Sequence, residues 1–156
     1  MKFDLRPYEG AGCVRFGMIR AEVHEKLGMP EQNWKMRSGN FAEAWSSFVM
    51  RYDKTSQELI EMVFTDKATV EYKGINLFLD PDAFAKLVNF DGEALKGTGT
   101  IILLKLGISM GENMCDLSSS ERTICLFSRG CWDNALSRLK PYQPACENVG
   151  NPPPCG

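Results

Sequence analysis

Three stretches between residues 44 and 79 alternate apolar and polar side chains, the period of a β-strand with one buried face. The stretches are residues 44–53, 58–66 and 68–79. In the first of them, the apolar set on one face is Phe48, Met50 and Tyr52. Their connectors are short and polar, so we expect three antiparallel neighbours in one sheet.

A helix is predicted on each side of these strands. Residues 17–28 carry apolar side chains at the spacing of one buried stripe, and Gly28 ends the helix. That stripe consists of Ile19, Val23 and Leu27. Residues 80–93 predict the second helix, with Asp80 as its N-cap. Its expected buried residues are Phe84, Leu87 and Val88.

The remaining elements complete a mixed fold. Residues 98–110 and 122–131 are typical of two further, more buried strands, and 132–142 of a short closing helix or turn around a buried Trp132. The order predicts an α+β fold, an antiparallel β-sheet with helices packed on one face. Aligning the helices at an offset of 60 residues superposes Lys26 on Lys86 and Leu27 on Leu87, which indicates a degenerate tandem repeat.

The length of 156 residues fits one domain with its own core. We expect a single globular α+β domain over residues 1–142. Residues 143–156 contain four prolines and two glycines, which predicts a flexible tail. The first residues lack the apolar region of a secretory signal, and no apolar run is long enough to span a membrane. We therefore expect a cytoplasmic protein that does not bind membranes.

The six cysteines are expected to be free, mostly buried thiols. No C-x-x-C pair is present, and the cysteine spacings match no zinc site. The two cysteines expected to be most exposed are Cys146 and Cys155, in the tail.

No residue pattern indicates catalysis. The single histidine, His24, lies beside the buried stripe of the first helix, where a structural role is expected. The serine cluster at 118–120 lies in a polar turn, and the "GTG" at 97–99 precedes a strand, not a helix that could hold a phosphate. We expect no enzyme activity, no metal and no cofactor.

Charge is distributed unevenly along the chain. The net charge is −2, which gives no reason to expect nucleic acid as a partner. Residues 53–93, however, carry 9 acidic and 4 basic residues. If Glu61 and Glu71 share a sheet face, that face could dock a basic partner. The candidate partner-binding residues are Trp45, Asp53, Glu58, Glu61 and Glu71.

The segment "GCVRFGMIRAEVHEKLGMP", residues 12–30, resembles a recurrent bacterial pattern. Related segments occur in outer-membrane assembly lipoproteins of the SmpA/BamE kind, and two-repeat β-lactamase inhibitory proteins have similar helix-plus-sheet units. The matching positions are Gly17, Met18, Glu22, Val23, Leu27, Gly28 and Pro30.

Three further pieces, "VMRYD", "LIEMVF" and "LKLGIS", are similar to segments of immunity proteins from polymorphic-toxin systems. The resemblance implies a protein that neutralises a cognate secreted toxin by blocking its active site, and a toxin with a basic cleft would suit the acidic residues. Two alternatives remain open: a small-ligand-binding protein or enzyme that uses the space between helices and sheet, and an envelope scaffold.

Overall fold

The computed structural model describes residues 1–143, which form a mixed structure that is mostly β-sheet. Apart from Gln143, the expected tail lies outside the described residues. None of the helices within residues 1–143 is long and apolar enough to cross a membrane.

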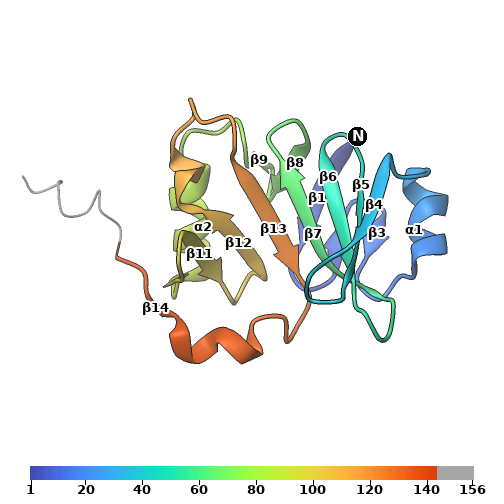
Figure 1. The fold of residues 1–156 in the computed structure, drawn as a ribbon. Helices are drawn as coiled ribbons and strands as arrows, with labels where there is room; N and C mark the ends of the chain where they lie inside the picture. The colour runs from blue at the N-terminus through green and yellow to red at the C-terminus, as the bar shows by residue number, and fades with distance from the viewer. Residues whose placement is uncertain (144–156) are drawn as a thin grey trace, which may run out of the picture.

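The larger sheet has nine strands in the order β14-β10-β11-β12-β13-β7-β6-β5-β4, and every pairing in it is antiparallel (Figure 1). Its first half contains β4 (Gln32–Lys35), β5 (Phe41–Ala44), β6 (Phe48–Tyr52) and β7 (Leu59–Thr65). Its second half contains β10 (Leu95–Lys96), β11 (Thr100–Leu103), β12 (Ile108–Gly111), β13 (Thr123–Phe127) and β14 (Lys140–Pro141). The two halves meet where β7 pairs with β13.

A smaller sheet packs on one side of the larger one. It has the order β3-β2-β1-β8-β9, with β1 (Lys2–Arg6), β2 (Gly10–Ala11), β3 (Val14–Arg15), β8 (Thr69–Tyr72) and β9 (Ile75–Asn76). The ring of Phe3 on β1 lies 5.1 Å from that of Phe48 and 4.8 Å from that of Phe64, between centroids. We call the face of the nine-stranded sheet that these rings cover its inner face.

The expected pairing of the third strand is wrong. Residues 69–72 form β8, which pairs in parallel with β1 in the smaller sheet and does not extend the sheet of β6 and β7. The reason lies outside the local sequence: β1 offers β8 a partner, and β13 takes the place beside β7. Glu61 and Glu71 consequently lie in different sheets and do not share a face.

Both expected helices are present, each shorter than expected. The first, α1, spans Arg20–Leu27 and buries Val23, whereas Ile19 precedes the helix and is 46% exposed. The second, α2, spans Ala83–Asp91, with Asp82 and not Asp80 as its N-cap residue. Asp80 instead accepts a hydrogen bond from the Asp82 amide in the turn before the helix.

The buried faces explain the strand pattern. On β6, Phe48, Met50 and Tyr52 all point into the core, as the alternation predicts.

The expected single strand over residues 98–110 is a hairpin, because Gly107 adopts a left-handed φ of 67° in the turn between β11 and β12. One 3₁₀ helix, η1 (Glu112–Cys115), lies between β12 and β13, and a second, η2 (Asp133–Arg138), lies between β13 and β14.

Two smaller expectations need correction. Trp132 is half-buried, and its ring meets Phe127 edge-on at 6.2 Å instead of entering the core. The four described cysteines are free, but three of them are exposed where buried thiols were expected. These three are Cys13, Cys115 and Cys131.

Candidate functional site

A fully buried carboxylate, that of Glu43, holds α1 against the sheet. Glu43 lies opposite Met50 in the β5–β6 pairing, so its side chain points to the inner face, where it has no exposed surface. A buried charge is costly unless it is paired and hydrogen-bonded. The residues that meet this requirement come from α1 and from β6.

Three side chains surround the Glu43 carboxylate. Arg20 Nε donates to Oε2 at 2.9 Å, and the Tyr52 hydroxyl donates to Oε1 at 2.8 Å. His24 Nε2 lies 2.9 Å from Oε1 and 2.8 Å from Oε2. Arg20 and His24 are four residues apart and therefore project from one side of α1. The helix, only eight residues long, is fixed by this cluster and by buried Val23.

The Tyr52 hydroxyl has a strongly raised pKa. Burial, followed by the hydrogen bond and the negative charge of Glu43, raises the pKa of Tyr52 far above its usual value of 10.0. Tyr52 therefore stays a hydrogen-bond donor throughout the neutral range.

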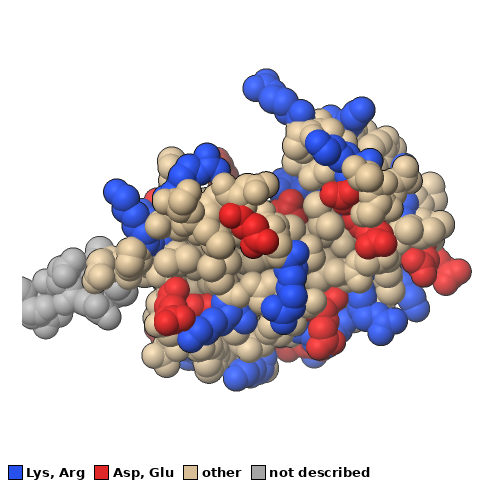
Figure 2. All heavy atoms as spheres, turned by 90° about the horizontal axis from the view of Figure 1, so that it is seen from below, with Lys and Arg blue, Asp and Glu red and all other residues tan. Residues whose placement is uncertain are grey.

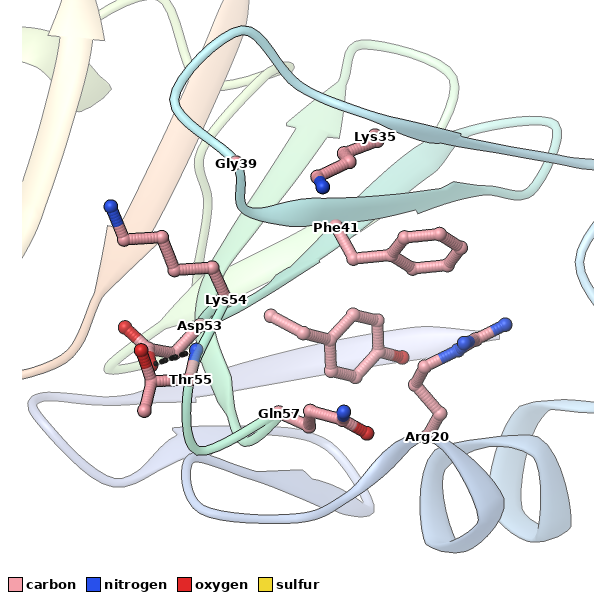
Figure 3. Close-up of a pocket in the computed structure, with 9 residues that line it drawn as sticks. Arg20, Lys35, Gly39, Phe41, Asp53, Lys54, Thr55 and Gln57 are labelled. Atoms are coloured by element: carbon pink, nitrogen blue, oxygen red, sulfur yellow. Dashed lines mark hydrogen bonds between the residues drawn. The ribbon is translucent and has the colours of Figure 1, made fainter.

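An open cleft of about 500 Å³ lies next to this cluster, between the start of α1, β4, β5 and the β6–β7 turn (Figure 3). We call it the α1 cleft. Its cations are Arg20, Lys35 and Lys54, which reach it from three different elements. Phe41 and Tyr52 also border it, although Tyr52 has no exposed surface. Its volume lies within the range of small-molecule sites in proteins.

Two contacts hold the walls of the α1 cleft in place. The Arg20 guanidinium lies over the ring of Phe41, 4.0 Å from its centroid, while its Nε bonds to Glu43. On the opposite side, the Asp53 carboxylate accepts hydrogen bonds from the amides of Ser56 and Thr55, both at 2.8 Å. These bonds lower the pKa of Asp53 and fix the β6–β7 turn. The cleft is therefore formed before any ligand arrives.

The structure brings together two of the five candidate partner-binding residues. Asp53 lines the α1 cleft, and exposed Glu58 ends the same turn, where the Asp53 amide donates to the Glu58 carbonyl at 2.9 Å. Trp45 is half-buried next to the Glu43 cluster, with its ring edge-on to His24 at 6.4 Å and stacked on Phe48 at 5.1 Å.

The other two candidates lie elsewhere, and each has an ionic partner. Glu61 is on the face opposite the core, with Arg51 Nη1 at 3.6 Å. Glu71 lies in the smaller sheet, 3.5 Å from Lys2 Nζ. On the surface seen in Figure 2, acidic and basic side chains are interspersed and do not gather by sign. The binding role of all five residues remains a prediction.

Of the residues that frame the cleft, only Asp53 was singled out from the sequence as a binding residue. Glu43 stands between two alanines on a short strand, and only the Arg20/His24 spacing on α1 hinted at a shared acidic partner. Within residues 1–143, no group of three or more His, Cys, Asp and Glu side chains is placed to hold a metal ion.

Comparison with known proteins gives no relative. No protein-family model matches the chain, and no curated protein or solved structure is significantly similar to it.

Proposed function

We propose that the protein is an immunity protein, which binds a cognate secreted toxin in the cytoplasm and blocks the toxin's active site without catalysing a reaction. The observation that carries this proposal is the preformed α1 cleft beside the β4 edge of the nine-stranded sheet. Its walls are fixed by the buried Glu43 cluster and by the Asp53 turn, so little ordering is needed on binding. The toxin class itself comes from the resemblance in the sequence.

The edge strand and the turn next to the cleft have the composition of a protein-binding surface. The edge strand β4 is exposed along its whole length, and its Trp34 is 42% exposed. Lys35, the next residue on the strand, points to the opposite face and lines the cleft, and exposed Glu58 follows Gln57, which also lines it. An exposed tryptophan among charges of both signs is typical of the residues that dominate protein–protein affinity.

The test is growth rescue when the protein is co-expressed with the product of its neighbouring gene. The informative variants are Lys54→Glu and Glu58→Lys, because both residues are exposed and neither has an ion pair within residues 1–143. Matched controls are Lys67→Glu and Glu121→Lys, which are exposed and outside the cleft. We expect Lys54→Glu and Glu58→Lys to raise the dissociation constant of the complex about tenfold at low salt, and the two controls to leave it unchanged. Equal protection by all four variants would contradict the proposed surface.

A second candidate function, binding of a small molecule, is favoured by the size of the α1 cleft alone. It predicts that the protein purified from its source retains a molecule that is released on denaturation. A mass spectrum of the native protein measures this directly.

We also propose that the fold is a tandem repeat whose helices pack on one face. Each helix is followed by a four-stranded antiparallel meander, and the two meanders join at β7 and β13. The 60-residue offset also pairs buried positions on the inner face and on the helices. These pairs are Val23 with Ala83, Phe48 with Ile108, and Met50 with Met110.

A further inference from the structure

We infer that the α1 cleft binds a singly charged carboxylate attached to an apolar or aromatic group. This inference rests on the proposal that the cleft is a binding site, and it names the chemistry that the site accepts. The carboxylate could belong to an acidic side chain of a partner protein or to a free small molecule; the recognising groups are the same in both cases.

The charge of the cleft favours an anion. Three cations line it, and the one carboxylate in its wall, that of Asp53, already accepts two backbone hydrogen bonds. Lys35 and Lys54 form no ion pair within residues 1–143. Lys35 and Lys54 add positive charge to the lining of the cleft, and a concave surface focuses the resulting potential.

The amount of charge favours a monoanion. Glu43 offsets Arg20 through the bond to Nε, and Asp53 offsets one of the two lysines. One positive charge therefore remains unbalanced, which a single carboxylate neutralises and a phosphate dianion exceeds.

The geometry supplies donors that suit a planar group. The bond to Glu43 uses only Nε of Arg20, and the Nη groups have no hydrogen bond among the described residues. Because the guanidinium is held over Phe41, these donors are oriented before binding, and a planar carboxylate matches their fork. The ring of Phe41 then provides an apolar contact for the group that carries the carboxylate.

The test is an NMR titration of the ¹⁵N-labelled protein with matched pairs of probes. Benzoate is compared with neutral benzamide, and the capped peptide acetyl-Ala-Glu-Ala-amide with its glutamine counterpart. Inorganic phosphate serves as the dianion. We expect both carboxylates, and neither amide, to shift the backbone amides of residues 53–57 and of Phe41. Tighter binding of the peptide assigns the carboxylate to a partner protein, and tighter binding of benzoate assigns it to a free molecule.

The variant Lys35→Gln/Lys54→Gln tests the charge. We expect its affinity for benzoate to fall about tenfold at about 20 mM salt, and the difference to shrink at about 500 mM. The matched control, Lys26→Gln/Lys67→Gln, removes two exposed lysines outside the cleft and should bind as the wild type does. All four lysines are exposed, so both variants should unfold at the wild-type midpoint.

Three results would overturn the inference: equal shifts with benzoate and benzamide, unchanged benzoate affinity in the cleft variant, or phosphate binding tighter than benzoate. None of them decides the toxin proposal, which depends on growth rescue. Carboxylate binding without rescue would leave the inference standing and contradict the proposed function.

Discussion

Replacing Tyr52 by phenylalanine removes a single hydrogen bond from the buried Glu43 cluster. The ring, which is fully buried, keeps its packing, and Glu43 keeps Arg20 and His24 as partners. The lost bond is a 2.8 Å contact between a hydroxyl and a carboxylate without exposed surface. Hydrogen bonds to charged groups contribute about 1.5–3 kcal/mol, so we expect the free energy of unfolding to fall by about 2 kcal/mol at neutral pH.

Urea unfolding followed by tryptophan fluorescence measures this difference. The midpoint should fall without a change in slope, and the melting temperature should fall by about 4–8 °C for a chain of this length. Tyr72→Phe is the matched control, because Tyr72 is also buried and its hydroxyl has no hydrogen bond among the described residues. It should change the free energy of unfolding by less than about 0.5 kcal/mol.

Alkaline pH provides a second, independent check on the same bond. The folded pKa of Tyr52 is raised, so its stabilising contribution is complete below the unfolded pKa of 10.0 and is lost as the pH rises above it. By about pH 11 the free energy of unfolding of the wild type should have fallen by about 1.4 kcal/mol for this reason. Tyr52→Phe has no hydroxyl to ionise, so the difference in stability between the two proteins should narrow. A variant that matches the wild type at neutral pH, or a gap that does not narrow, would refute the role given to this bond.

Three further predictions concern the cluster, the core and the outer sheet face. Glu43→Ala should lower the free energy of unfolding by about 3–5 kcal/mol in urea, since it removes the shared partner of a buried ionic cluster. Phe3→Ala should cost about 3–5 kcal/mol in the same assay, because Phe3 packs between the rings of Phe48 and Phe64. Burial, and then the Glu61 charge, raises the Cys125 pKa above 9.0. The stability that depends on this thiol is therefore lost as the pH rises above 9. By about pH 10 the free energy of unfolding of the wild type should have fallen by about 1.4 kcal/mol, a loss that Cys125→Val should not show.

Local pattern predicted the elements whose burial is periodic. The alternation on β6 and the glycine stop after the first helix, at Gly28, match the structure because backbone conformation and core contact act on neighbouring residues. The polar strand β4 was not among the predicted strands, because all four of its residues are exposed and none repeats a buried position. An edge strand of this kind takes its pairing from β5 and carries no pattern of its own.

Long-range pairings could not be predicted from the same patterns. β8 alternates like any strand, but its parallel partner β1 lies more than 60 residues earlier in the chain. The α1 cleft is a similar case: Arg20, Lys35 and Lys54 come from three elements, and each reads in the sequence as an ordinary exposed cation. Predicting the burial of Glu43 requires knowing its partners, because an acidic residue next to alanines is more often exposed.

Co-purification of the tagged full-length protein with the product of its neighbouring gene tests the central claim most directly. We predict a stoichiometric complex, with a defined mass by light scattering, that dissociates about tenfold more readily when Lys54→Glu or Glu58→Lys is introduced. Separate elution of the two proteins at concentrations well above micromolar, together with undiminished toxicity of the neighbour, would contradict the account.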